Sequence, residues 1–398
     1  MNNQTLSSLK LAGLRATGVV RAAARDSRLV RWSMKADLLR QQFKSRCKHF
    51  FAPKRPAKTN RLRILVHIRG GIGDVVMTRP FMRVLRVHLP QAEISFCYDS
   101  SAVVNMVFPD LIDRYQPTAY RPQDYDLVIA GCHFLFFTHY DKNRLAQLAP
   151  AFLPILEEGL SVQACFKPFD LYTPYLDGQL AEIAISLGGN RIMNLGWSTG
   201  LPVSHADMTP IPLEAAATQQ ALAKMGLAGK KYITIHDGIN VHTDTSSGHP
   251  TRCWPEAHWR TFARAFKAQF PDVLLVQLGG NKSHVFDFAD ISLVGKSAVQ
   301  DLPHILKHAM LHVDGESGMA HLASAMQTPC VVLFGPSRPE YLAYRGNTSI
   351  VSPKCCGCMN ISAHWMTTCI LGFPYAQQCM AAITPDTVLQ AVVSYLKK

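Results

Sequence analysis

Asp74 follows a glycine-rich turn, a position in which a carboxylate could accept a proton from a bound ligand. The turn Gly70-Gly71-Ile72-Gly73 lies between a predicted strand and a predicted helix. Glycines there let the backbone turn sharply and approach a ligand, and the helix that follows offers free amide donors. Because Asp is also a common helix cap, this motif alone fits either a base or a structural cap.

A second group of reactive side chains opens a later helix. Arg252 could bind a diphosphate through its forked guanidinium, and Pro255 suits the first turn of a helix. Trp254 and Trp259 could wall a pocket, or they could pack beneath the helix. The motif is therefore compatible with an anion site, with packing as the alternative role of the two indoles.

A third group, Glu316-Ser317-Gly318 with His321, follows a predicted buried strand and begins a helix rich in small residues. Amides at such a helix start can bind phosphate oxygens. The acid just before them could bind a ribose or sugar hydroxyl. His321 fits either a substrate contact or a hydrogen-bonded core histidine.

Four of the 11 cysteines have the spacing of a metal site. Cys355 and Cys358 form a close pair, and Cys369 and Cys379 lie within reach of one loop. We expect structural zinc or iron at these four thiols, which would pin the loop and leave no open position for chemistry. Cys356 leaves the choice within the run open, and free cysteines also serve as small buried hydrophobes.

Two successive α/β units must position these motifs. Short apolar strands alternate with helices up to residue 200, and the pattern restarts after a Pro-rich stretch, which predicts two doubly wound Rossmann-like domains with parallel sheets. Ligands of such sheets sit at the carboxyl ends of the strands, so the facing edges should form the active site. The predicted segments are a basic extension (1–60), an N-terminal domain (61–200), a linker (201–212) and a C-terminal domain (213–398) that contains the cysteine cluster and a final helix.

The basic extension carries almost all of the net charge. Residues 1–60 contain 14 Lys and Arg against two acids, and so +12 of the formal +13. The remainder is nearly neutral, which argues against a nucleic-acid-binding protein. An amphipathic helix of this composition suits an anionic membrane surface, and equally a helix packed on the body of the protein or a subunit contact.

Export and membrane insertion are not indicated. Arg15, Arg21 and Arg25 interrupt the early apolar stretch, and no run of ~18 uncharged apolar residues follows. We therefore expect a protein of the reducing cytoplasm, peripheral at the inner face of the cytoplasmic membrane if the extension binds lipid.

Taken in order, the three motifs resemble glycosyltransferase family 9, the ADP-heptose lipopolysaccharide heptosyltransferases and their relatives. The matches are Gly71 to Asp74 with Pro80, Leu85, Arg86 and Pro90; Arg252, Trp254, Pro255 and Trp259; and Glu316 to Leu322 with Phe334, Gly335 and Pro336. The family usually has Lys and Asp where this chain has Arg252 and Glu316. Charge is kept at both positions, but the altered shapes leave the donor sugar open.

The resemblance implies a GT-B fold and an inverting glycosyltransferase without an obligatory catalytic metal. The implied donor is a nucleotide sugar such as ADP-heptose, and the implied acceptor is a cell-envelope glycan, a lipopolysaccharide or a protein. Asp74 is then the general base. Gly71 and Gly73 form the acceptor-side loop, and the donor side consists of Arg252, Trp254, Glu316, Ser317, Gly318 and His321.

Two other classes of protein share this pattern. A nucleotide-sugar-binding scaffold could keep the fold without turnover. A dinucleotide-dependent oxidoreductase is less favoured, because the first turn lacks the third spaced glycine and Asp74 occupies the helix start where pyrophosphate should lie.

Overall fold

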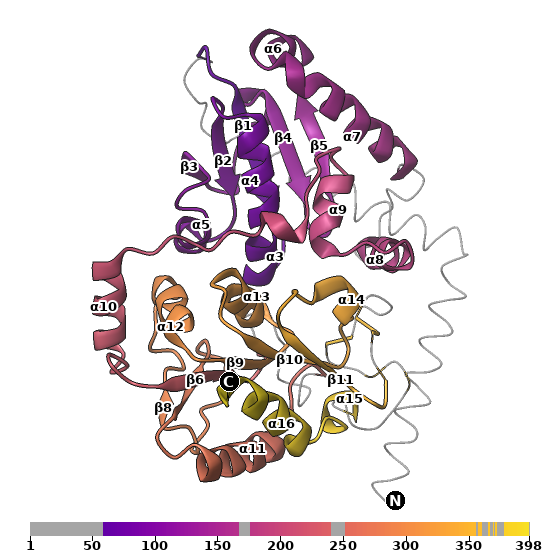
Figure 1. Ribbon diagram of the computed structural model, residues 1–398. Helices are drawn as coiled ribbons and strands as arrows, with labels where there is room; N and C mark the ends of the chain where they lie inside the picture. The colour runs from indigo at the N-terminus through magenta and orange to yellow at the C-terminus, as the bar shows by residue number, and fades with distance from the viewer. Residues whose placement is uncertain are drawn as a thin grey trace, which may run out of the picture.

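The computed structural model describes residues 59–166, 176–239, 251–355, 357–359, 365–366, 369, 371 and 378–397. The predicted basic extension, 1–60, lies outside these residues except for its last two. The described chain forms two α/β domains stacked end to end (Figure 1), which is the predicted architecture. Within them, no helix is both long and apolar enough to cross a membrane.

The N-terminal domain is built on a five-stranded sheet in the order β3-β2-β1-β4-β5. Its strands are β1 (Arg63–Ile68), β2 (Glu93–Cys97), β3 (Arg114–Gln116), β4 (Leu127–Gly131) and β5 (Leu135–Tyr140). The first four are parallel, but β5 runs antiparallel to β4, which corrects the prediction of a parallel sheet. Residues 132–134 are too few for a crossover, so the chain must turn back. A Cβ on Gly131 would lie 1.8 Å from the Phe134 carbonyl oxygen, so only glycine permits this turn.

The helices of this domain connect its strands and lead toward the second domain. They are α3 (Ile72–Met77), α4 (Arg79–His88), α5 (Ser101–Val107), α6 (Lys142–Leu148), α7 (Leu153–Phe166), α8 (Leu176–Ser186) and α9 (Arg191–Trp197), with short 3-10 turns at Pro122–Asp124 and Pro150–Phe152. The sequence predicts one helix from Val75 to Leu89, whereas α3 and α4 are separated at Thr78. Pro80 has no amide to continue the hydrogen-bond ladder of α3, so a new helix begins there.

The C-terminal domain has a six-stranded parallel sheet in the order β11-β10-β9-β6-β7-β8. Its strands are β6 (Tyr232–His236), β7 (Leu274–Leu278), β8 (Ile291–Ser292), β9 (His312–Gly315), β10 (Cys330–Phe334) and β11 (Thr348–Val351). The strands β6, β9 and β10 are buried along nearly their whole length, as expected for a parallel sheet covered on both faces.

Helices cover both faces of this second sheet. They are α10 (Ala215–Lys224), α11 (Glu256–Gln269), α12 (Leu302–His308), α13 (Gly318–Ala325), α14 (Pro339–Leu342), α15 (Gln378–Ala381) and α16 (Pro385–Leu396), with 3-10 turns at His205–Asp207 and Val299–Asp301. α12 and α13 lie on the side that faces the N-terminal domain, and α11 and α16 lie on the other (Figure 1).

Arg79 ties the segment between α9 and α10 to the N-terminal domain. Its side chain is fully buried and forms a two-pronged ion pair with Asp110, with both nitrogen–oxygen distances 2.8 Å. Its guanidinium also donates to the carbonyls of Thr209 and Pro210, at 2.9 and 3.0 Å. The predicted linker, 201–212, is therefore held against the first domain by a buried arginine.

The two domains meet where the starts of α3 and α13 touch (Figure 1). A Cβ on Gly73 would lie 2.6 Å from Cδ2 of His321, and a Cβ on Gly318 would lie 2.4 Å from Cγ2 of Ile72. Real Cβ atoms do not approach so closely, so the glycines allow these two helix starts to abut. The contact brings the first and third sequence motifs together.

Candidate active site

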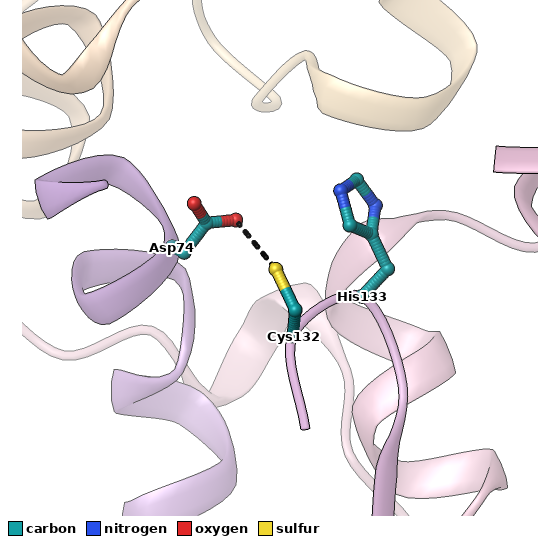
Figure 2. A group of neighbouring side chains, drawn as sticks. All are labelled: Asp74, Cys132 and His133. Atoms are coloured by element: carbon teal, nitrogen blue, oxygen red, sulfur yellow. Dashed lines mark hydrogen bonds between the residues drawn. The ribbon is translucent and has the colours of Figure 1, made fainter. Parts of the chain in front are cut away.

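Asp74 lies in the first turn of α3, beside the domain contact. Its Oδ2 accepts the Gly71 amide at 2.8 Å and its Oδ1 accepts Nη2 of Arg191 at 3.2 Å. The Cys132 thiol donates to the same Oδ1 at 3.8 Å. Figure 2 shows Asp74 facing Cys132 and His133, which lie in the turn between β4 and β5. The Asp74 side chain is 26% exposed, so a ligand can still reach the carboxylate.

Arg191 is the buried ion-pair partner of the Asp74 carboxylate. Its side chain is fully buried at the first position of α9, which Asn190 caps through the amides of Ile192 and Met193. Its guanidinium also donates to the carbonyls of Cys132 and His133, at 2.6 and 3.2 Å. Arg191 therefore fixes the β4–β5 turn and Asp74 relative to each other. The sequence analysis missed Arg191, because its partners lie far away along the chain.

These four residues, Asp74, Cys132, His133 and Arg191, are called the Asp74 cluster below. Burial raises the pKa of Asp74, but the charge of Arg191, with smaller contributions from His133 and the Gly71 amide, outweighs burial and holds it below its usual value. Burial and Arg191 together lower the pKa of His133 to about 4. At neutral pH the cluster therefore contains an ionised carboxylate beside a neutral imidazole.

The cluster also has donor types found in metal sites. Ligand atoms of Asp74, Cys132 and His133 lie within 4.8 Å of one another, the one such set of three among the described residues. However, the guanidinium of Arg191 already supplies a cation to the same carboxylate oxygen and would repel a metal ion there. The geometry therefore favours a carboxylate held for proton transfer over a metal site.

The C-terminal domain closes over this cluster with two tyrosines and the predicted Glu316 and His321. Tyr341 stacks on His133, with ring centroids 5.8 Å apart, and its hydroxyl lies 3.2 Å from Nδ1 of His133. Oε1 of Glu316 lies 2.9 Å from Nε2 of His321, whose Nδ1 lies 3.2 Å from the Tyr344 hydroxyl. Burial raises the pKa of Glu316, but the bond to His321 and the charge of Arg252 keep it lower than usual. Glu316 is therefore a buried carboxylate between the two domains.

A cavity of about 390 Å³ adjoins the α3–α13 contact, and no residue of the Asp74 cluster lines it. We call it the interdomain cavity, because both domains line it. Its walls are Gly71, Ile72, Tyr98, Asp99, Ser100 and Val103 from the first domain, and His236, Ile239, Arg252, Gly280, Lys282, Ser283, Ser317, Gly318 and Met319 from the second. The volume is in the range of small-ligand sites.

The structure brings several of the predicted site residues to this cavity. Gly71, Arg252, Ser317 and Gly318 line it, although the sequence motifs that contain them are up to 247 positions apart. Nε of Arg252 donates to the Gly238 carbonyl at 3.1 Å, which directs the guanidinium without using its outer nitrogens for this bond. The Ser317 hydroxyl caps α13 by accepting the Met319 amide at 3.1 Å, and it donates to Asp314.

Trp254 does not line the cavity, in contrast to the prediction. Its side chain is 3% exposed and lies in the core beneath α11, where it contacts Trp259 and Phe262. Its indole nitrogen donates to the Ile383 carbonyl at 2.9 Å. The apolar surface of the indole is better buried against this aromatic cluster than exposed in a polar cavity, so the packing alternative describes its position.

The sequence analysis also missed His236 and Asp314. His236 ends β6 and lines the cavity, and Asp314 is the next-to-last residue of the neighbouring strand β9. Nδ1 of His236 lies 3.1 Å from Oδ2 of Asp314, whose side chain is fully buried. Their positions near the carboxyl ends of predicted parallel strands were the one feature of the sequence that could have identified them as site residues.

The predicted metal-binding cysteines lie beside the C-terminal sheet. Cys355, Cys358 and Cys369 are half-buried and Cys379 is buried. Burial, together with the nearby Cys355 and Cys358, raises the pKa of the Cys379 thiol to about 12. These three thiols are thus neighbours in space, and a bound cation would favour their thiolate forms.

Residues 198–360 match the model of glycosyltransferase family 9 (heptosyltransferase). This part of the chain is therefore similar to the family 9 glycosyltransferases. The middle and late motifs lie within it, so the resemblance inferred from them is confirmed. Lipopolysaccharide heptosyltransferase 1 of Pseudomonas aeruginosa is 24% identical over 105 residues, which are 25% of this chain and 30% of that protein. The chain thus matches less than a third of that relative's length.

Solved structures extend the likeness in fold to most of this chain. ADP-heptose lipopolysaccharide heptosyltransferase II of Escherichia coli is 17% identical, with a TM-score of 0.54 over 84% of this chain and 99% of that one. TibC of enterotoxigenic E. coli, a dodecameric iron-containing heptosyltransferase solved with ADP-D-β-D-heptose, is 15% identical, with a TM-score of 0.54 over 85% of this chain and 77% of that one. At such identities the likeness establishes the fold, which is GT-B as predicted.

Proposed function

We propose that this protein is an inverting glycosyltransferase that moves a sugar from a nucleotide-sugar donor, such as ADP-heptose, to an acceptor hydroxyl. One observation carries the proposal: an ionised carboxylate, Asp74, and an anion-binding wall, Arg252 with the start of α13, flank the same helix contact. Transfer needs a base for the acceptor and stabilisation of the departing diphosphate. The two halves of that requirement lie on opposite domains.

In the proposed reaction the acceptor oxygen attacks the anomeric carbon while Asp74 takes the hydroxyl proton. The bond between that carbon and the diphosphate oxygen breaks, and the diphosphate leaves with the electron pair. Arg252 and the amides of Ser317 and Gly318 stabilise its charge. Attack from the face opposite the leaving group inverts the anomeric carbon.

The other predicted residues support these steps from their observed places. Glu316 and His321 form a buried pair next to Arg252 and the Asp74 cluster, where the carboxylate could receive a sugar hydroxyl. Gly71 lines the cavity and Gly73 lets the two helix starts abut. The acceptor is proposed to be a cell-envelope glycan, a lipopolysaccharide or a protein, and it approaches from the N-terminal domain.

Turnover of nucleotide sugars by the purified protein tests this function. We expect slow hydrolysis of ADP-heptose, and faster loss when heptose-free lipopolysaccharide is added, monitored by release of ADP. UDP- and GDP-sugars serve as donor controls. Binding of the donor without any release of ADP would instead describe a nucleotide-sugar-binding scaffold.

We further propose that Cys355, Cys358, Cys369 and Cys379 hold structural zinc or iron. The support is the C-x2-C spacing, the proximity of Cys379 to the first pair, and the iron of the similar TibC. The amides of Gly357 and Met359 donate to the carbonyls of Gly335 and Pro336, at 3.1 and 2.8 Å, so the segment is docked at the end of β10. A metal would pin this segment, and no catalytic cofactor is proposed.

Elemental analysis of protein purified without added metal tests the cysteine site. About one equivalent of zinc or iron is expected, with the four thiols protected from titration in the folded protein. Metal well below one equivalent, with all four thiols reactive, would leave only their packing role.

The basic extension is proposed to hold the enzyme at the inner face of the cytoplasmic membrane. Its charge of +12 motivates this, because each Lys or Arg near an anionic surface contributes about 1 kcal/mol. Vesicles containing phosphatidylglycerol should bind the full chain in a salt-sensitive way. Equal binding by a variant in which the Lys and Arg of residues 1–60 are replaced by Gln would contradict it.

A further inference from the structure

His236 lies between two carboxylates at the floor of the interdomain cavity. Its Nδ1 is 3.1 Å from Asp314 and its Nε2 is 3.5 Å from Asp237. All three side chains are more than nine-tenths buried. Two carboxylates this close to the ring favour the charged form of the imidazole, although the Gly238 amide, which faces Nδ1 at 3.2 Å, opposes a proton on that nitrogen.

Further hydrogen bonds hold both acids in place. Asp314 also accepts the Ser317 hydroxyl and lies 3.4 Å from Nε2 of His312. Asp237 accepts the Ser283 hydroxyl and the His284 amide, each at 3.0 Å. Neither carboxylate can swing away from the cavity, so their charge must be balanced where they are.

The balance matters for a diphosphate because these acids lie directly behind its predicted binding wall. Arg252, Ser317 and His236 line the same cavity, and Arg252 is close enough that its charge opposes protonation of His236. With a neutral imidazole, two buried carboxylates would repel an incoming anion. With an imidazolium, the net charge of the three groups falls from −2 to −1, so less negative charge opposes the attraction of Arg252 for the ligand.

We propose that His236 is a positioning residue for the donor: as an imidazolium it halves the net negative charge of Asp314 and Asp237 and so favours binding of the diphosphate against Arg252 and the start of α13. The inference rests on the proposed function of the cavity. It adds that the imidazole of His236 must be protonated when the donor binds. Binding of the donor diphosphate then requires the protonated state of a group that neither touches the sugar nor accepts the acceptor proton.

The direction of the pH effect follows from the groups around the ring. Burial lowers the pKa of His236, but Asp314 and Asp237 outweigh it and raise the pKa above its usual value. Donor affinity should therefore be full at neutral pH and fall as the pH rises through this raised pKa. The charged or titratable groups facing the ring or its partners are Asp314, His312, Asp237, Arg252, Lys282 and, across the cavity, Asp99.

ADP-ribose is a suitable probe, because its diphosphate is esterified at both ends and does not titrate near neutral pH, whereas the terminal phosphate of ADP does. Calorimetry from pH 6 to pH 9 should show roughly tenfold weaker binding at the alkaline end for the natural protein. His236→Gln should bind about tenfold more weakly at pH 6.5 and lose most of this pH dependence. His308→Gln, at an exposed position on α12, is the matched control.

Asp314→Asn provides a second variant that keeps the histidine. Removal of the closer acid should lower the pKa of His236 and move the alkaline loss of binding to lower pH. NMR titration of the imidazole in the ligand-free protein measures the same pKa, and ADP-ribose should raise it because binding favours the proton. Melting temperatures of both variants report whether they fold.

The possible failures are distinguishable. If the natural protein binds no ADP-ribose and no nucleotide sugar at any pH, the proposed function and this inference both fall. If it binds ADP-ribose with an affinity that is constant from pH 6 to pH 9, or if folded His236→Gln binds like the natural protein, only the inference falls.

Discussion

The two sides of the α3–α13 contact use charge in opposite ways. In the Asp74 cluster the fully buried Arg191 donates hydrogen bonds to one carboxylate and to two carbonyls, all in the same domain. In the interdomain cavity, Arg252 donates through Nε to the Gly238 carbonyl, and it lines a space shared by both domains. A carboxylate held in a fixed direction suits a base, which must stay aligned with its substrate. A guanidinium at the wall of a cavity suits the reversible binding of a ligand.

The largest effect is expected at the base. Asp74→Asn should lower kcat roughly a hundredfold or more while the affinity for the nucleotide sugar stays nearly constant, because the amide cannot accept the proton. Rates of ADP release and calorimetry on one preparation measure both quantities. Asp287→Asn, whose side chain is 70% exposed on the surface, is the control. Near-normal kcat in Asp74→Asn would remove the base from this cluster.

Removal of Arg191 should act on stability and on pH dependence together. Arg191→Met leaves Asp74 without its cation, so the free energy of unfolding should fall by about 3 kcal/mol, as for other broken buried ion pairs. The exposed pair of Arg260 and Glu256 provides the comparison, since Arg260→Met should cost less than about 1 kcal/mol.

The same Arg191→Met variant sharpens the assignment of the base. Because Arg191 holds the pKa of Asp74 below its usual value, its loss should raise that pKa. The acid side of the kcat–pH profile should therefore move to higher pH. An unmoved acid limb in a folded Arg191→Met protein would show that Asp74 is not the group that titrates in the rate.

A smaller effect, confined to binding, is expected in the cavity. Arg252→Ala should weaken binding of ADP about 10- to 100-fold, the value of a charge-assisted hydrogen bond lost. Arg252→Lys should retain only part of the ADP affinity of the natural protein, because an ammonium group lacks the forked geometry of the guanidinium. Arg264→Ala, at an exposed position of α11, is the control. Unchanged ADP affinity in Arg252→Ala would place the diphosphate elsewhere.

The smallest effect is expected from substitutions at the α3–α13 contact itself. Gly73→Ala introduces a methyl group 2.6 Å from His321 and 3.3 Å from Cα of Gly318, so the domains must separate slightly. We expect kcat to fall about tenfold with little change in ADP affinity, because misalignment of donor and base slows transfer. Gly71→Ala, where the nearest atom would lie 4.0 Å away, should have the smaller effect. Equal rates for both variants would argue against coupling through this contact.

Local patterns were sufficient to predict the architecture. Runs such as 63–68, 232–236 and 330–334 are apolar enough to be strands buried on both faces, and the glycine, proline and hydroxyl residues after them mark turns and helix starts. The rule that ligands gather at the carboxyl ends of parallel strands then placed Gly71, Arg252 and Ser317 near one site. These are properties of segments shorter than about fifteen residues, which a sequence displays directly.

The sequence by itself thus predicted two Rossmann-like domains whose motifs face each other, and it proposed Asp74 and Arg252 as candidate charged residues of the site. Only the tertiary structure decided what each charge touches. Arg191 reaches Asp74 from 117 positions away, His236 meets Asp314 across neighbouring strands, and Trp254 turns from the pocket into the core. The physical reason is that charge pairing and burial depend on distances in space, which the order of residues does not contain.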